Sequence, residues 1–600
     1  MSDFIYTSEL LSREALEHSL NVFPPDVRSK THFFQGDWGS LISSEGPYCG
    51  FLPLETESHI FLIVGGPVLR FRDNSFLVAE NSRAATEAVY QRWQANQIDW
   101  SEDLSGPFAA LLVDKNTGVV STITDLMSFI PVYRHHSEAR TVIGSHVDAV
   151  ASIAGEKDRV DRFSAADFVL HGLVTYPYTL YANINQISPA SIHELTVGSR
   201  SNLEGCYWTP PSASTEKPIQ DVARNLRESL QEYVGLVASW MDGVASFISG
   251  GEDSRVVMSL LSRVTKNDAY IFLEGMNPEG RVAQKASEIF GARFFLMKRD
   301  EERYLRLLPQ CSDLVGSGSQ YAHAHTYEYH ISAGLVNYSA VFGGFASDRL
   351  LKGEHTVLVR GSGRVLFFPE IADTKSYKPD KVSDIFSDDI ISVVKQRRRE
   401  HWDRVFKLRG KESADEWFNV WPSSMAVGAP NIHANRRLFR SYEPFLDCRV
   451  VKLACEIPQS WKLNRRVFRQ VAAPLLLPAK WLLHVKGWSP LLPFWANSPL
   501  KLYFRIIKSL RRKLGNSDVH DGPWLSRRKL VRNPMWFAFE SAVEGQAGLC
   551  NLFSASGGDF HSWYTRLAWK QKLNIFQMAH NLGLIDGKKV VEGENRNGSS

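Results

Sequence analysis

Residues 244–257 read VASFISGGEDSRVV, and this stretch decides the fold of the second half of the chain. Its apolar first part predicts a buried strand, and its second part predicts a turn that opens into a helix. The adjacent glycines Gly250 and Gly251 let the backbone approach an anion closely, and the helix offers its first amides to that anion. The carboxylate of Asp253 would repel a phosphate here unless Mg²⁺ lay between them. The stretch therefore predicts a site for a metal-bound nucleotide, although it lacks the Walker pattern G-x-x-x-x-G-K-S/T.

Helical and strand patterns alternate around this stretch. We expect, in chain order, a helix at 226–241, a strand at 244–248, a helix after Ser254, a strand at 270–273, a helix at 281–291, and strands at 293–297 and 338–342. Strands and helices that alternate at this spacing predict a parallel sheet covered by helices. Ligands of such sheets lie at the carboxyl ends of the strands, where the loop Ser249–Ser254 is expected.

The region before residue 208 has a different pattern. Residues 59–70, 107–113 and 117–123 are short apolar runs between turn residues, and residues 84–93 have apolar side chains at helical spacing. The polar, proline-rich stretch 209–218 breaks all periodicity. We therefore expect two domains, a strand-rich one over 1–208 and an α/β one over 219–600. The second would contain a less regular insertion at 352–430 and a disordered tail at 588–600.

The composition excludes several classes of protein. A chain of 600 residues with 44% hydrophobic content is expected to form more than one core. The net charge of +4 is small and dispersed, which does not indicate a nucleic-acid binder. The six cysteines have no zinc-site spacing and fit reduced thiols. Since no apolar run is long enough to span a membrane and no secretory signal is visible, a cytoplasmic location is expected.

Several segments carry a resemblance to a known family. The loop Ser249–Ser254 resembles the S-G-G-x-D-S signature of the pyrophosphate-loop ATPases. Residues 341–351 (VFGGFASDRLL), 443–451 (EPFLDCRVV) and 477–490 (LPAKWLLHVKGWSP) are similar to later segments of asparagine synthetases, in that family's order. The resemblance implies an N-terminal glutaminase-like α+β sandwich of the Ntn type, followed by an α/β ATP-pyrophosphatase synthetase domain with a parallel sheet.

The resemblance also implies roles for individual residues. Asp253 and Asp348 would bind Mg²⁺ that bridges the phosphates of ATP. Lys486 would stabilise negative charge on the α-phosphate and the acyl oxygens, so that Lys486, Asp253 and Asp348 are the expected catalytic residues. The residues expected to hold ATP are Phe247, Ser249, Gly250, Gly251, Asp253, Ser254, Phe272, Gly343, Gly344 and Lys486.

Other polar residues keep two interpretations each. Arg255, Arg349, Arg465 and Arg469 are either phosphate ligands or partners in structural ion pairs. The segment Tyr321–His330 (YAHAHTYEYH) brings together His323, His325, Glu328 and His330, but this spacing fits no common zinc site, and substrate contact or ordinary packing are the alternatives. The charged run Lys395–Glu400 is either a solvated helix face or a contact with an anionic or peptide partner.

The N-terminal domain departs from the glutamine-using members that it resembles. Those members have a nucleophilic cysteine at position 2, whereas this chain has Ser2, and Gly65-Gly66-Pro67 replaces their Asn-Gly-Glu. Cys49-Gly50 imitates the motif but is internal, so that it has no free α-amine to act as its base. We therefore expect no glutaminase activity and an amine that the substrate itself supplies.

Two kinds of relative use such an amine, β-lactam synthetases and lasso-peptide macrolactam synthetases. Phe345 stands where asparagine synthetases have Glu and β-lactam synthetases have a Tyr that helps to remove the amine proton. Phenylalanine cannot accept a proton, and a peptide α-amine, with a pKa of about 8, needs less help than a more basic amine. This favours an ATP-dependent synthetase that adenylates an Asp or Glu side chain of a ribosomal peptide. The N-terminal amine of the peptide would then close a macrolactam, releasing AMP and pyrophosphate.

The expected cofactors are ATP and Mg²⁺, and the expected partner is the precursor core peptide. A leader-peptide protease and a leader-binding protein are open as further partners, whereas no nucleic-acid or membrane partner is expected. A β-lactam synthetase or an ammonia-dependent asparagine synthetase is the alternative activity. A tRNA-modifying adenylating enzyme and an inactive nucleotide-binding scaffold also remain open.

Overall fold

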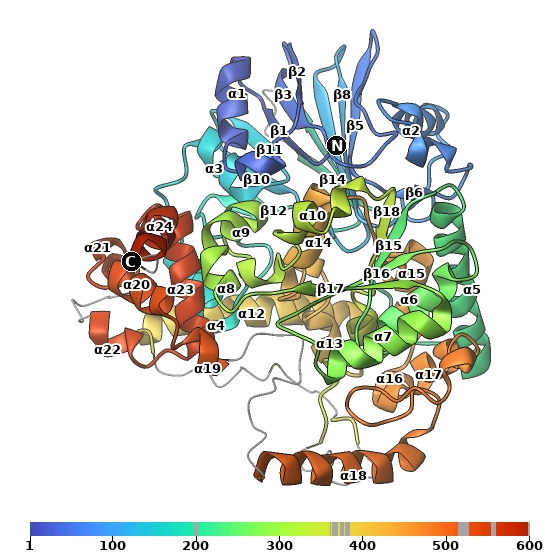
Figure 1. Ribbon diagram of the computed structural model, residues 1–600. Coiled ribbons are helices and arrows are strands. Elements are labelled where there is room, and N and C mark those ends of the chain that lie inside the picture. The colour runs from blue at the N-terminus through green and yellow to red at the C-terminus, as the bar shows by residue number, and fades with distance from the viewer. Residues whose placement is uncertain are drawn as a thin grey trace.

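Two antiparallel sheets form the first half of the molecule, and a parallel sheet lies in the second half (Figure 1). The computed structural model describes residues 1–196, 202–359, 362, 370–372, 377, 385–513, 527–553 and 560–597. In the first half, the described strands form two six-stranded antiparallel sheets, ordered β12-β10-β11-β1-β3-β2 and β14-β13-β9-β8-β5-β4. The first sheet contains β1 (Asp3–Thr7), β2 (Thr31–Gly36), β3 (Gly39–Ser44), β10 (Tyr133–His136), β11 (Thr141–Gly144) and β12 (Ile184–Gln186). The second contains β4 (Leu54–Glu55), β5 (His59–Gly65), β8 (Phe108–Asp114), β9 (Val119–Thr124), β13 (Ser191–Thr196) and β14 (Asn202–Cys206), and β6 (Val68–Leu69) pairs with β7 (Leu104–Ser105).

Side chains along the central strands of the second sheet alternate between two buried cores. On β5, Ile60 and Leu62 point into the core shared with the first sheet, whereas Phe61 and Ile63 point into the core beneath α2 (Ala84–Gln94). The strands expected near 59–70, 107–113 and 117–123 and the helix expected at 84–93 are confirmed. The first half is therefore a sandwich, as expected.

The second half contains a five-stranded parallel sheet, ordered β17-β16-β15-β18-β19. Its strands are β15 (Val244–Phe247), β16 (Asp268–Leu273), β17 (Arg293–Lys298), β18 (Ala340–Phe342) and β19 (Ser441–Tyr442). The helices α5 (Ile219–Ala238), α6 (Asp253–Leu261) and α7 (Pro278–Phe290) accompany it. The expected α/β class and parallel sheet are confirmed. β14 ends at Cys206 and α5 begins at Ile219, and the domain boundary between them stays a prediction.

Further helices complete the described chain, and the label η marks a 3₁₀ helix. In the first half these are α1 (Arg13–Leu20), η1 (Pro25–Val27), η2 (Ser75–Val78), α3 (Val147–Ala154) and α4 (Arg162–His171). Up to residue 418 they continue with α8 (Arg303–Arg306), α9 (Leu308–Val315), η3 (Tyr321–His323), α10 (Tyr329–Ser332), η4 (Leu335–Asn337), α11 (Ser347–Leu351), α12 (Asp388–Arg409) and α13 (Ala414–Phe418). The next group is η6 (Ser423–Met425), α14 (Pro430–Leu438), η7 (Pro444–Leu446), α15 (Cys448–Glu456), α16 (Gln459–Lys462), η8 (Leu463–Arg465), α17 (Arg466–Ala472), η9 (Leu477–Ala479) and α18 (Phe494–Lys513). The last are α19 (Arg527–Leu530), α20 (Pro534–Val543), α21 (Ala547–Phe553), α22 (Phe560–Tyr564), α23 (Trp569–Asn581) and α24 (Gly587–Asn597).

The C-terminal helices lie together at one side of the molecule, and α18 lies at its lower edge in Figure 1. Asn574 on α23 donates hydrogen bonds to the backbone of α4, and the amide of Tyr321 donates to Gln577. The tail expected to be disordered is helical through Asn597, because Val591 on α24 is buried in the core beneath it, and residues 598–600 lie outside the described chain. No helix in the described part of the chain is both long and apolar enough to cross a bilayer.

The charged run Lys395–Glu400 forms part of α12 and is not simply a solvated face. Arg397 pairs with Asp161, and the buried Arg398 pairs with Asp167 on α4 at 3.5 Å. The run therefore helps to attach α12 to the first half. Part of the expected insertion at 352–430 lies outside the described residues, and its described remainder includes the helices α12 and α13.

Candidate nucleotide site

The loop Ser249–Ser254, called the first loop below, joins β15 to α6 at the carboxyl end of the sheet. Hydrogen bonds to the hydroxyl groups of its own serines stabilise the turn of this loop. The Ser249 amide donates to the Ser254 hydroxyl at 3.1 Å, and the Gly251 amide donates to the Ser249 hydroxyl at 3.1 Å. The two hydroxyl oxygens lie 3.0 Å apart. The expected position of the loop at a strand end is confirmed.

Gly250 lies between α7 and the segment Leu477–Pro490. Its amide donates to Glu279 Oε1 at 2.8 Å, and its carbonyl accepts from the Val485 amide at 3.3 Å. A Cβ atom at Gly250 would lie 2.9 Å from the Cβ atom of Val485, so a side chain here would force one segment to move. This close approach explains why position 250 is a glycine.

Arg255 connects the first loop to the segment Leu477–Pro490. Its guanidinium is fully buried and donates to the carbonyls of Gly250, Leu482 and Leu483 at 2.8–3.0 Å. Of the two interpretations of Arg255, these backbone contacts favour the structural one. The arginine fixes the segment that carries Lys486 against the first loop.

The second loop, residues 343–348, follows β18 and brings Asp348 next to Asp253. A Cβ atom at Gly344 would lie 3.4 Å from the backbone of Asp253, so the two loops are in contact. The ammonium of Lys352 lies between the aspartates, 2.6 Å from Asp253 Oδ2 and in direct contact with Asp348 Oδ1. Glu252 Oε1 is 3.6 Å from the same nitrogen. The structure therefore brings both predicted metal ligands to one cation position.

Burial and charge oppose each other at this position. Burial raises the pKa of Glu252, although Arg465 and Lys352 counteract it, and burial with the neighbouring Asp348 raises the pKa of Asp253. Burial disfavours the charged form of Lys352, but the surrounding carboxylates outweigh it and raise the pKa of this lysine. Asp253 Oδ1 is buried and has no hydrogen-bond partner among the described residues. A free carboxylate oxygen beside a second aspartate fits a Mg²⁺ ligand set.

Cationic side chains surround the first loop. The Lys486 side chain is exposed, and its amide donates to His484 Nδ1 at 3.0 Å. Arg465 contacts Glu252 and lies 3.5 Å from the centre of the Trp488 ring. Burial, and then the nearby Arg465 and Arg466, lower the pKa of Arg469. Neighbouring arginines such as these are suited to bind a polyanion.

Phe247 and Phe272 lie side by side at the ends of β15 and β16, with ring centres 5.7 Å apart. Phe272 stacks on Tyr329 at 4.2 Å, and the Arg303 guanidinium lies 4.8 Å from the centre of the Tyr329 ring. The two phenylalanines are only partly buried. Their position beside the first loop is compatible with the expected contact to adenine, which stays a prediction.

The segment Tyr321–His330 does not converge on a metal. Glu328 pairs with Arg303 and Arg306, and His330 lies 3.6 Å from Asp26. Burial lowers the pKa of His323 to about 4 and that of His325 to about 3. Within the described ranges, no group of three His, Cys, Asp or Glu side chains is arranged to hold a metal ion. Arg349 likewise has structural neighbours, Glu354 at 3.4 Å and the Phe345 ring at 5.3 Å.

Two family models match this chain. The model described as a glutamine amidotransferase domain matches residues 69–208, and the model described as asparagine synthase matches residues 225–513. Together they cover more than half of the 600 residues. The chain belongs to the asparagine synthetase family. The first half of this family member is thus the glutaminase-like domain that the sequence led us to expect.

One curated relative of the family is an asparagine synthetase (glutamine-hydrolyzing) 3 of Bacillus subtilis. It is 24% identical over 217 residues, which are 32% of this chain, and the match spans only 35% of that relative. Among solved structures, a glutamine phosphoribosylpyrophosphate amidotransferase from B. subtilis is 9% identical, with 51% of this chain and 92% of that chain covered and a TM-score of 0.25. An ammonia-dependent NAD synthetase from Campylobacter jejuni is 16% identical, with 36% and 94% covered and a TM-score of 0.18.

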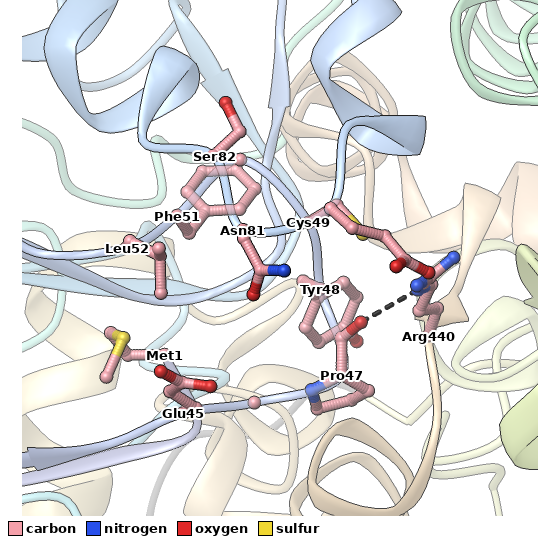
Figure 2. A pocket seen from close by; sticks show the side chains of 13 residues that line it. Met1, Glu45, Pro47, Tyr48, Cys49, Phe51, Leu52, Asn81, Ser82 and Arg440 are labelled. Atoms are coloured by element: carbon pink, nitrogen blue, oxygen red, sulfur yellow. Dashed lines mark hydrogen bonds between the residues drawn. The ribbon is translucent and has the colours of Figure 1, made fainter. Parts of the chain in front are cut away.

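In this asparagine synthetase family member, a cavity of about 170 Å³ lies beside Met1, between the glutaminase-like domain and Arg440 of the second half (Figure 2). The cavity is lined by residues that include Cys49, Asn81 and Arg440, and the Arg440 guanidinium donates to the Pro47 carbonyl at 2.7 Å. Burial raises the pKa of the Cys49 thiol, which disfavours the nucleophilic thiolate. The Ser2 hydroxyl bonds to Ser44 and to the Glu45 carbonyl. Neither side chain has the surroundings of an activated nucleophile.

Sequence reasoning missed four charged residues at the site. These are Glu252, Glu279, Lys352 and Glu443. Glu443 is buried, and one of its oxygens accepts from the Phe345 amide at 2.9 Å. Glu252 and Glu443 lie inside segments that carry the family resemblance, so their position was a usable signal. Lys352 directly follows the segment 341–351, but it is the first residue of the expected insertion at 352–430.

Proposed function

We propose that this protein is an ATP-dependent amide ligase that activates a carboxylate as an acyl-adenylate and then transfers the acyl group to an amine. The observation that carries the proposal is the meeting of Asp253 and Asp348 at one cation position beside the first loop. Asp253 and Asp348 would hold Mg²⁺, which would neutralise charge on the phosphates of ATP. Family membership supports the same chemistry.

The residues around the first loop have separate tasks in this proposal. The first amides of α6 would receive the departing pyrophosphate, because the amides of Ser249, Gly250 and Gly251 already have partners within the protein. The exposed ammonium of Lys486 can reach the α-phosphate side, because Arg255 holds the Lys486 segment against the loop. Arg465 and Arg469 supply the positive charge that a leaving pyrophosphate needs.

Glu443 is the proposed acceptor of the amine proton. Burial raises its pKa to about 7, while the hydrogen bond from the Phe345 amide acts in the opposite direction. A carboxylate with this pKa is suited to accept a proton near neutral pH. A Cβ atom at Gly343 would lie 2.1 Å from Glu443 Oε1, so the carboxylate lies directly against the second loop.

We further propose that the amine belongs to the substrate and that the product is a macrolactam of a ribosomal peptide. Two observations support this choice. The glutaminase-like cavity lacks an activated nucleophile, so an internal supply of ammonia from glutamine is not expected. In addition, Lys529 on α19 pairs with Glu274 and Glu301 near the ends of β16 and β17, so a C-terminal helix lies beside the carboxyl edge of the sheet. A larger surface at this edge would suit a peptide substrate. A leader-peptide protease would be a partner of this reaction.

An ammonia-dependent asparagine synthetase or a β-lactam synthetase is the alternative. The position of Glu443 at the second loop is the observation that favours these alternatives. Phe345 favours a peptide α-amine because it cannot accept a proton, yet Glu443 lies at the same loop and can accept one. A more basic amine therefore has a proton acceptor in this site as well.

Mass spectrometry of a candidate core peptide incubated with the protein, ATP and Mg²⁺ tests the proposal. We expect a peptide lighter by one water, with AMP as the nucleotide product. Asp253→Asn should lower product formation by about 100-fold or more, because the metal loses a charged ligand. Asp242→Asn is the matched control, since Asp242 is exposed near the opposite end of β15 and should leave the rate unchanged.

Other products would distinguish the alternatives. Asparagine formed from aspartate and ammonia would replace the macrolactam proposal by the ammonia-dependent one. A β-lactam formed from a small amino acid would do the same for the β-lactam synthetase. ADP in place of AMP, or full activity of Asp253→Asn, would contradict adenylation at this site.

A further inference from the structure

Lys352 is the feature of the site that the proposed function does not use. It follows α11 directly, and its side chain is 8% exposed. The Nζ atom is 2.6 Å from Asp253 Oδ2, contacts Asp348 Oδ1 and lies 3.6 Å from Glu252 Oε1. It also lies 4.9 Å from the centre of the Phe468 ring. One ammonium group thus connects the first loop, the second loop and α17.

The charges around Lys352 do not balance locally. Three carboxylates surround its nitrogen, and only Glu252 has a second cationic partner, Arg465, in the described part of the chain. Asp348 is 62% exposed, whereas Lys352 and Glu252 are almost fully buried. The site therefore retains negative charge that faces the solvent through Asp348, which is a suitable entrance for a second cation.

Lys352 and a divalent ion cannot occupy the same position. A Mg²⁺ ion that bridged Asp253 and Asp348 would need oxygen ligands at about 2.0–2.1 Å from both. The ammonium already fills the space between these two carboxylates. Its four-carbon stem is flexible, so the nitrogen can move away without a change of the backbone. Phosphate oxygens beside the first loop would offer it a new anionic partner.

We propose that Lys352 is a built-in placeholder for the divalent ion. It holds the two loops together before the nucleotide binds and prevents a free metal ion from binding there alone. The divalent ion enters with ATP, whose phosphates accept the displaced ammonium. This inference rests on the proposed nucleotide site, but it concerns metal binding and can fail or succeed separately from the ligase reaction.

Electron paramagnetic resonance of Mn²⁺ without nucleotide tests the proposal. The wild-type protein should bind Mn²⁺ weakly, and Lys352→Gln should bind it about 10-fold more tightly or better, because a competing positive charge is removed. Adding ATP should reduce the difference between the two proteins. Lys480→Gln removes an exposed lysine from the segment Leu477–Pro490 and should bind Mn²⁺ as the wild type does. Equal or weaker Mn²⁺ binding by Lys352→Gln would overturn the proposal.

Thermal unfolding separates this role from a merely structural one. Without Lys352, the three carboxylates repel each other, so the Tm of Lys352→Gln should fall in metal-free buffer and recover when Mn²⁺ is added. A fall that Mn²⁺ does not reverse would mean that Lys352 only stabilises the fold, and would overturn the proposal. Lys352→Arg keeps the charge and should bind Mn²⁺ as weakly as the wild type. If Lys352→Gln binds Mn²⁺ tightly but no amide product ever forms, the proposed function fails and this inference stands.

Discussion

At the residue scale, Glu443 illustrates how the fold changes a side chain's chemistry. The residue is 4% exposed and lies between the second loop and β19. Burial disfavours its charged form, so the pKa rises from 4.5 to about 7. The unfolded chain keeps the ordinary value. Glu443 therefore favours the folded state below about pH 4.5, and that contribution is lost as the pH rises through about 7.

The same shift predicts the pH dependence of the reaction. Amide formation by the wild type should increase as the pH rises through about 7, because the Glu443 carboxylate must lose its proton before it can accept one. Glu443→Gln should lower the rate of amide formation by about 100-fold and remove this dependence. Exchange of pyrophosphate into ATP, which reports the first half-reaction, should change far less.

Rates of both half-reactions measured between pH 5.5 and 9 would check this. Glu288→Gln is the control, since Glu288 is exposed on α7. If Glu443→Gln slowed both half-reactions equally, Glu443 would be a structural residue of the second loop and not a proton acceptor.

At the scale of elements, the position of Lys486 depends on how its segment packs. Gly487, the next residue, has a φ of +80°, and a Cβ atom there would lie 2.2 Å from the Phe504 ring on α18. On the other side, Arg255 and the Val485 amide attach the segment to the first loop. The lysine is therefore held from two directions by elements that the sequence separates widely.

Gly487→Ala should move the Lys486 segment. The methyl group must displace Phe504, and the left-handed backbone adds strain, so the free energy of unfolding should fall by about 1–3 kcal/mol. Pyrophosphate exchange should fall by about 10-fold or more, because Lys486 leaves its place near the first loop. Denaturant unfolding and the exchange assay measure the two effects.

Gly545→Ala is the matched control for this prediction. Gly545 has a φ of +74°, but nothing lies within 4 Å of the position of its Cβ atom. The control should show the backbone strain without the clash and should leave pyrophosphate exchange unchanged. An equal loss of exchange in both variants would contradict the proposed link between Gly487 and Lys486.

At the scale of the whole molecule, a buried ion pair joins the two halves. Asp3 on β1 accepts from Arg437 Nε at 2.9 Å and from Arg436 Nη2 at 3.1 Å, both on α14. All three side chains are buried. Burial alone would raise the pKa of Asp3, but the two arginines outweigh it and hold that pKa well below its usual range. The glutaminase-like half is thus tied electrostatically to the synthetase half.

Asp3→Asn should destabilise the protein by about 3–5 kcal/mol, because two buried guanidinium groups lose their counter-charge. In the wild type, the contribution of Asp3 is fully present above the unfolded pKa of about 3.8 and is lost as the pH falls through the lower folded value. Urea unfolding at neutral pH and at pH 3 would measure both effects. Asp221→Asn, which breaks an exposed pair with Arg224, should cost less than about 1 kcal/mol. A similarly small cost for Asp3→Asn would show that the interface does not depend on this pair.

The sequence by itself determined the elements and their order. Hydrophobic periodicity predicted β5, β8, β9, α2 and the strands β15 to β18 of the parallel sheet, because burial on one or two faces imposes a period that can be read locally. The glycine-rich turn after β15 placed the first loop at the end of a strand for the same reason. The family resemblance then predicted catalytic roles for Asp253, Asp348 and Lys486. The short strand β19 was not predicted. Helix α24 was missed, because its polar residues hide one buried face.

The tertiary structure alone decided which charges meet. Lys352 reaches Asp253 across 99 residues, Arg437 reaches Asp3 across 434 residues, and the Glu443 carboxylate meets the Phe345 amide across 98 residues. Such contacts leave no periodic pattern in the chain. Burial also sets the pKa of Glu443, and burial depends on what the fold places around a residue. The sequence therefore predicts which residues belong to the site, whereas the fold decides which partners they contact and how they are protonated.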